Sequence, residues 1–202
     1  MAIEHATIEH EALEPRPYRF TTDQYHQMGE AGVFNPGDRV ELIDGEIIAM
    51  NPIGDPHAGG VNRLNQAFLM RLVGRAVIAP QNPVRLARHD EPQPDLAILR
   101  FRDDFYATRG PRPEDVLLIV EVSDSSASYD RRVKAPLYAS NGIPEYWMVD
   151  LARGQVIVFR DPSPDGYRSE QTHRRGDSLS LVALPEISIA VAEILGGPVE
   201  PA

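Results

Sequence analysis

Three side chains in the sequence have the chemistry of a hydrolytic metal site: Asp95, Glu121 and Lys134. Glu121 interrupts the apolar run VLLIVEV at 116–122, and a carboxylate buried in a strand must be neutralised, paired or bound to a metal. Asp95 follows a proline at the start of another apolar run, 94–100. If these runs form neighbouring strands, both carboxylates lie at one sheet edge, where hard oxygen ligands favour Mg²⁺ or Mn²⁺.

Each carboxylate taken alone also fits a simpler interpretation. Glu121 fits equally well a strand that ends there and meets water. Asp95 alone fits a turn residue better than a ligand, because Pro-Asp is a common dipeptide. The metal-site hypothesis therefore rests on the two acids together.

Lys134 is the only lysine in the chain, since the other 19 of the 20 basic residues are arginines. An ammonium is a compact point charge whose pKa can shift, and a guanidinium cannot replace it in that role. Beside a metal it could position or help to deprotonate an attacking water. Thirteen residues separate it from Glu121, which lets the chain leave a strand and return along a helix. A solvated helix face is the alternative interpretation.

The elements that must position these residues follow from periodicity and turn signals. We expect a mixed α/β (α+β) chain in which helices flank one central mixed sheet. Asp44-Gly45 predicts a β-hairpin, and Pro136 predicts a kink or a late start in its helix. Expected helices span 21–32, 57–75 and 129–141; expected strands span 76–79, 83–87, 94–100, 116–122, 144–150, 155–160, 166–173 and 178–182; residues 187–195 fit a strand or a short helix.

Length and composition limit the class of protein. The 202 residues predict one domain over 17–195, with tails at 1–16 and 196–202. The absence of cysteine excludes thiol catalysis and cysteine-ligated metals. The net charge is −10, with ten acids and three arginines in residues 1–50, and no basic stripe marks a DNA-binding face. No apolar run predicts a membrane span or a secretory signal, and a cytoplasmic location is the default expectation.

Four segments together resemble one family. The stretch EVSDSSASYDRRVKAPLYASNGIPEYWMVD, the run QPDLAIL, and the segments RVELIDGEIIAM and HAGGVNRLNQAFL are similar to the Uma-type restriction endonucleases of the PD-(D/E)XK nuclease superfamily. The resemblance covers about residues 17–195. It implies a restriction-endonuclease-like core with a divalent-metal site, in which Asp95 and Glu121 match the superfamily's two acids. The superfamily's lysine position is Ser123 here, and the resemblance implies that Lys134 on the following helix replaces it.

The resemblance adds two further candidates, Glu41 and His57. Glu41 matches an acid that an N-terminal element contributes, and with Asp95 and Glu121 it completes the expected metal ligands. An ordinary hairpin carboxylate is an equal alternative, and Asp44 and Glu46 are rivals for the role. His57 could contact a phosphate or a metal-bound water, or simply begin a helix.

Three other residues fit structural roles. We expect Asp130 to cap the helix that carries Lys134. Tyr146 and Trp147 are predicted to be core aromatics.

The expected function is hydrolysis of DNA phosphodiester bonds by a Mg²⁺- or Mn²⁺-dependent endonuclease, with catalytic residues Asp95, Glu121, Lys134, Glu41 and His57. The alternative is a non-catalytic, dimeric binding or regulatory module that keeps the fold, which the weak basic character and Ser123 favour. A carboxylate-pair glycoside hydrolase ranks lower, because one tryptophan and few aromatics offer little surface for sugars. DNA is the expected partner, and no association with a membrane is expected. The sequence leaves open whether the protein forms a homodimer.

Overall fold

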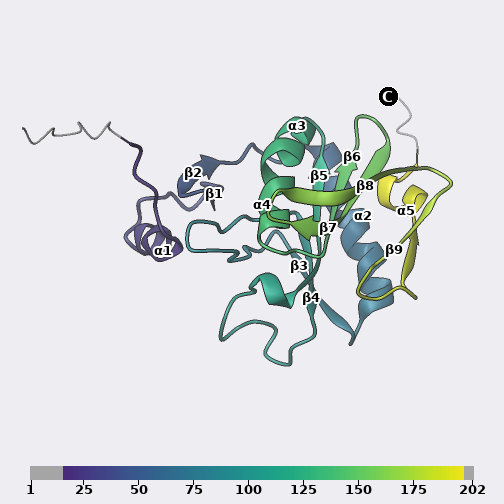
Figure 1. Cartoon of the computed structure of the whole chain (residues 1–202), viewed down its shortest axis with the longest axis horizontal. Coiled ribbons are helices and arrows are strands. Elements are labelled where there is room, and N and C mark those ends of the chain that lie inside the picture. Colours follow the sequence, from purple (N-terminus) through teal and green to yellow (C-terminus); the bar gives the residue numbers. More distant parts are fainter. Residues whose placement is uncertain (1–15, 198–202) are drawn as a thin grey trace, which may run out of the picture.

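A six-stranded mixed sheet forms the centre of the protein, and the computed structural model describes residues 16–197 of it (Figure 1). The strand order is β3-β4-β5-β6-β7-β8. Only β5 and β6 are parallel, and the other neighbours are antiparallel. The strands are β3 (Ala76–Pro80), β4 (Leu96–Arg100), β5 (Val116–Ser123), β6 (Glu145–Asp150), β7 (Gln155–Ser163) and β8 (Gly166–Arg174). This confirms the expected fold class.

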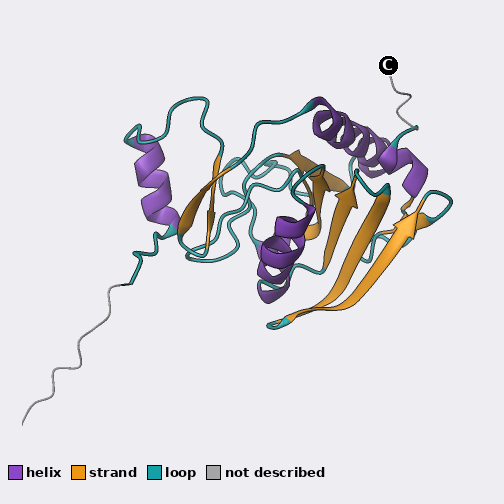
Figure 2. Ribbon diagram, turned by 90° about the horizontal axis from the view of Figure 1, so that it is seen from above, coloured by secondary structure: helices purple, strands orange, loops and turns teal. Residues whose placement is uncertain are grey.

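Alternating side chains of the central strands bury both faces of the sheet. On one face, Trp147 and Val149 pack with α2 (Asp55–Leu72) and α5 (Val191–Leu195). On the other face, Tyr146 and Met148 pack with α4 (Ala135–Ser140). Tyr146 and Trp147 are fully buried, as expected of core aromatics. Figure 2 shows α2 and α4 on opposite sides of the sheet, which explains why β5 and β6 are apolar at almost every position.

A smaller lobe precedes this core. It consists of α1 (Thr22–Glu30) and the hairpin of β1 (Val40–Ile43) and β2 (Glu46–Ala49), which turns at Asp44-Gly45 as predicted. Thr21 caps α1 through the backbone of Gln24. The lobe lies beside the sheet in Figure 2, and the pairing of Leu42 with Glu91 joins it to the core.

The strand predicted at 83–87 is wrong. This segment folds back on residues 90–92, where Leu86 N donates to Asp90 O and Val84 N to Pro92 O. The prolines at 83, 92 and 94 lack the N–H groups that a longer ladder needs. Apolar periodicity alone did not reveal this.

The helix predicted at 129–141 is interrupted, as Pro136 implies. It consists of α3 (Ala127–Tyr129), a π-helix at Asp130–Lys134, and α4. The N–H of Ala135 donates to Asp130 O, which is the widened turn of a π-helix immediately before the proline.

The remaining elements lie at the C-terminal end of the chain. The strand expected over 178–182 is the short β9 (Ser178–Ser180), which pairs with β10 (Ser188–Ala190). The segment 187–195 contains both alternatives, a strand in β10 and a helix in α5. Most of the two expected tails, residues 1–15 and 198–202, lie outside the described residues.

Candidate active site

Asp95 and Glu121 lie side by side at one end of the central sheet. Asp95 directly precedes β4, and antiparallel pairing of Leu96 with Val120 brings it to Glu121 near the end of β5. The backbone N–H of Asp95 donates to Glu121 Oε2 at 3.2 Å, and Val122 N donates to Asp95 Oδ2 at 2.8 Å. Both side chains are buried. The predicted juxtaposition of the two acids is therefore present, and neither carboxylate simply faces water.

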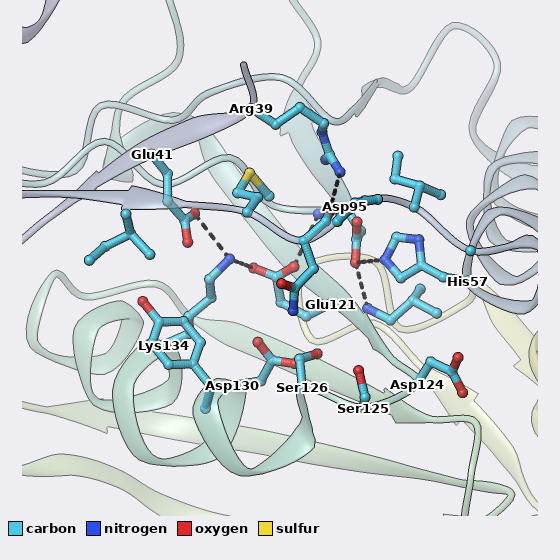
Figure 3. Close-up of a pocket in the computed structure, with 18 of the residues that line it drawn as sticks. Arg39, Glu41, His57, Asp95, Glu121, Asp124, Ser125, Ser126, Asp130 and Lys134 are labelled. Carbon is cyan, nitrogen blue, oxygen red and sulfur yellow. Dashed lines mark hydrogen bonds and ion pairs between the residues drawn. The ribbon is translucent and has the colours of Figure 1, made fainter. Parts of the chain in front are cut away.

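The Lys134 ammonium lies between two carboxylates (Figure 3). Its Nζ is 2.9 Å from Glu121 Oε1 and 3.1 Å from Glu41 Oε2. The lysine is itself buried, which contradicts the alternative of a solvated helix face. The displaced lysine thus reaches the acids from the end of the π-helix.

Tyr138 is a member of this cluster that the sequence did not single out. Its hydroxyl donates to Glu121 Oε1 at 2.7 Å, from α4. The signal was available, because Tyr138 lies four residues after Lys134 and so on the same helical face.

Buried negative charge dominates the electrostatics. Burial raises the pKa of Glu121 to about 8; Lys134 opposes this, while Asp95 adds to it. Burial lowers the pKa of Lys134, but Glu121 and Glu41 outweigh that effect and raise it above its usual value. The two carboxylates therefore favour the ammonium form of the lysine. Several carboxylates share this one cation, so the site retains an excess of negative charge.

Of the three N-terminal acids, the structure brings only Glu41 into the cluster. Its carboxylate binds Lys134 and accepts the N–H of Gln93 at 3.2 Å. The side chains of Asp44 and Glu46 are 77% and 55% exposed and pair with Arg19 instead. Of these three acids, therefore, only Glu41 lies beside the site.

His57 lies on the other side of Asp95. Its Nε2 is 2.9 Å from Asp95 Oδ2, and this hydrogen bond raises the pKa of the imidazole while burial opposes the rise. Within the described residues, its buried Nδ1 has no hydrogen-bond partner. The residue is in the first turn of α2, which begins two residues earlier than expected, at Asp55. Its contact with a phosphate or a metal-bound water stays a prediction.

The expected capping role of Asp130 is wrong. Ser126 is at the N-cap of α3, and Asp130 is inside the helical segment and buried. The Asp130 carboxylate accepts the hydroxyls of Ser123 at 2.6 Å and Ser126 at 2.7 Å. Ser123 occupies the superfamily's usual lysine position. Its side chain is buried there and donates a hydrogen bond to Asp130.

These groups form the floor of a cavity of about 430 Å³ between the small lobe and the sheet. One side is lined by Arg39 and apolar residues of β2 and the β2–α2 connection. Asp124, Ser125 and Ser126 line the side below the Asp95–Glu121 pair in Figure 3. Arg39 is a second residue that the sequence did not single out, since nothing distinguished it from the other arginines.

The donor set fits a divalent cation held by two carboxylates. Across residues 16–197, no cluster of three or more histidine, aspartate or glutamate side chains could hold a metal ion. Lys134 Nζ lies between Glu41 and Glu121, and the role of Glu41 as a third ligand stays a prediction. Two carboxylates suffice for Mg²⁺, which keeps water and substrate phosphate in its shell. The acids that line the cavity outnumber its buried lysine, and a divalent cation would compensate their surplus negative charge.

A mixed sheet with helices on both faces, and two acids and a lysine together at one end, defines a restriction-endonuclease-like α/β protein. Residues 22–192 match the profile of the family described as "Putative restriction endonuclease" (Uma2). The chain belongs to that family. No helix in the described part of the chain is long and apolar enough to cross a membrane.

A solved structure supports the fold. The crystal structure of a putative nuclease belonging to DUF820 from Anabaena variabilis ATCC 29413 superposes with a TM-score of 0.66, covering 87% of this chain and 97% of that one. The two sequences are 12% identical, so the likeness concerns the fold alone. Comparison with curated proteins gives no match.

Proposed function

We propose that this protein is a divalent-metal-dependent endonuclease that hydrolyses DNA phosphodiester bonds. The observation that carries the proposal is the convergence of Asp95, Glu121 and Lys134: Lys134 Nζ and the Asp95 N–H both bind the Glu121 carboxylate. Membership of a family described as restriction endonucleases supplies the substrate class. We place the protein in the cytoplasm, where DNA is accessible to it.

Asp95 and Glu121 would hold Mg²⁺ or Mn²⁺. Within residues 16–197, Asp95 Oδ1 forms no hydrogen bond or ion pair and is free for this. A bound divalent cation supplies Lewis acidity towards a phosphoryl oxygen and an attacking water. The Lys134 ammonium would orient that water or stabilise the negative charge that develops on the phosphate. Glu41 would hold Lys134 in place, and His57 would hold the Asp95 carboxylate.

The test is cleavage of plasmid DNA with Mg²⁺ or Mn²⁺ by the wild type and by the Asp95→Ala and Lys134→Ala variants. We expect cleavage by the wild type and its loss in both variants, with circular dichroism showing that the variants are folded. Cleavage that survives both substitutions would rule out this assignment.

A non-catalytic, dimeric binding module is the second candidate. The serine at position 123 favours it, as does the weak basic character of a chain with a net charge of −10. Titration calorimetry separates the two functions. The endonuclease should bind Mn²⁺ in the wild type and lose binding in Asp95→Asn, whereas a wild type that binds neither Mg²⁺ nor Mn²⁺ would favour the binding module.

A further inference from the structure

The candidate active site offers little positive charge to a nucleic acid. Five acids line it, and its only lining cations among the described residues are Arg39 and Lys134. Lys134 is committed to Glu41 and Glu121. Arg39 donates to the backbone oxygen of Asn51 at 3.4 Å and, within residues 16–197, forms no ion pair with a carboxylate. One guanidinium is therefore available to bind a phosphate next to the reacting one.

Half of the 18 other arginines already have an acidic partner and offer no free charge to a phosphate. Within the described residues, nine of them form ion pairs with an aspartate or glutamate of the same chain. These nine are Arg19, Arg71, Arg75, Arg85, Arg102, Arg109, Arg131, Arg153 and Arg160. Their charge is already compensated, and the whole chain carries −10.

Binding of a DNA duplex depends on many such contacts. Proteins that grip a duplex typically neutralise about 6–10 phosphates with lysine and arginine. A cleft with one free guanidinium does not provide them, and the acids around it repel the flanking phosphates of a stiff double helix. A flexible strand avoids this repulsion, because only one or two of its phosphates need enter the site.

The walls of the cavity suit a single unpaired nucleotide. Ile48, Met50 and Ile53 line it together with Arg39, and the Ile53 side chain is 41% exposed. Arg39 lies above the Asp95–Glu121 pair, and Asp124 and the serines lie below it (Figure 3). An apolar surface beside a guanidinium matches a base and sugar beside their phosphate. A paired base, which is stacked within a duplex, could not reach this surface without being flipped out.

We infer that the substrate is single-stranded DNA, or an unpaired end or loop of DNA, rather than intact duplex. The base and sugar next to the scissile bond contact Ile48, Met50 and Ile53, and Arg39 binds the adjacent phosphate. This inference rests on the proposed function, which places the scissile phosphate at Asp95 and Glu121.

The test is fluorescence anisotropy with a short dye-labelled oligothymidylate and with a labelled duplex of similar length. Ca²⁺ replaces Mg²⁺ so that binding is read apart from cleavage. We expect the single strand to bind at least tenfold more tightly than the duplex. Its log affinity should fall with log salt concentration at a slope of about −0.7 to −1.4, the value for one or two phosphate contacts on a single strand.

Two variants with a matched control test the residues. Arg39→Ala should weaken single-strand binding about 10- to 100-fold and reduce the slope by about 0.7, because it removes one charged phosphate contact. Ile53→Ser should weaken binding without changing the slope. Arg168→Ala, an exposed arginine on β8 remote from the cavity, should change neither.

The outcomes separate this inference from the function on which it rests. Duplex binding as tight as single-strand binding, or an equal effect of Arg168→Ala, would overturn the inference. If duplex plasmid is cleaved in an Asp95-dependent way without preference for single strands, the inference fails and the nuclease function stands. If single strands bind as expected and no DNA is cleaved, the nuclease function fails and the binding preference stands.

Discussion

Lys134 holds the candidate active site together, because its ammonium is shared by Glu121 on the sheet and Glu41 on the small lobe. The lysine is buried, and removing it would leave both carboxylates unpaired. A cation of another shape tests the site more sharply than a neutral residue, since the charge is kept and only the geometry changes.

We predict that Lys134→Arg reduces single-turnover DNA cleavage by about 100-fold or more, an effect typical of losing one stabilising donor in an active site. The planar guanidinium is too large for the space between oxygens that lie 2.9 Å and 3.1 Å from Nζ. Arg168→Lys, on exposed β8, is the control and should cleave at the wild-type rate. Wild-type cleavage by Lys134→Arg would mean that the ammonium has no specific role.

Residue chemistry predicted part of this site. Glu121 was identifiable because a carboxylate in an apolar strand needs a partner, whereas Asp95 became a candidate only together with Glu121 and through the family resemblance. The single lysine was identifiable by count. Arg39 could not be identified from the sequence. It differs from other arginines by lacking a carboxylate partner in the described structure, and only the fold reveals this. Glu41 could not be separated from Asp44 and Glu46 until the hairpin was placed against the sheet.

At the scale of elements, α2 packs closely against β5 near the site, at Gly60. A Cβ built on Gly60 would lie 2.9 Å from Val122 Cγ1, closer than real Cβ contacts. The backbone N–H of Val122 holds Asp95 Oδ2. Crowding at Gly60 would therefore displace the strand that orients Asp95, a proposed metal ligand.

We predict that Gly60→Ala destabilises the protein by about 1–3 kcal/mol, the usual cost of overpacking, and weakens Mn²⁺ binding. The neighbouring Gly59→Ala is the matched control. Its Cβ would be 3.4 Å from the flexible end of Arg63, and alanine favours the helix by about 1 kcal/mol. Urea unfolding and calorimetry measure both effects. Equal stability of the two variants would contradict the close α2–β5 contact.

Most elements followed from local pattern, and the exceptions have physical causes. The hairpin, α2 and the buried strands were expected because turn residues and apolar runs are local signals. The prediction of a strand at 83–87 was wrong because the prolines at 83, 92 and 94 cannot donate backbone hydrogen bonds to a neighbouring strand. The π-helix could be expected only as an irregularity near Pro136, since the bond from Ala135 to Asp130 depends on packing against the sheet.

At the scale of the whole molecule, a bound cation should appear as added stability. We predict that saturating Mn²⁺ raises the melting temperature of the wild type by about 5–10 °C. A ligand at about 100 times its Kd adds about 2.7 kcal/mol, and 1 kcal/mol moves the melting point of a chain of this size by about 2–4 °C. Asp95→Asn should show no shift, because the amide can still accept the Val122 N–H while losing the charge. Equal shifts in both proteins would place the cation elsewhere.

The parallel neighbour of β5 is β6, which follows Lys134 in the chain, so the site is completed late in synthesis. A growing chain contains Glu41, Asp95 and Glu121 well before the ribosome adds Lys134 and the strand at Glu145–Asp150. Until then, β5 lacks its parallel neighbour, and its carboxylate lacks the ammonium. A nascent chain therefore carries the acids without a functional centre. In the proposed nuclease, damage to the DNA of the cell that makes it would begin only after α4 and β6 have folded beside β5.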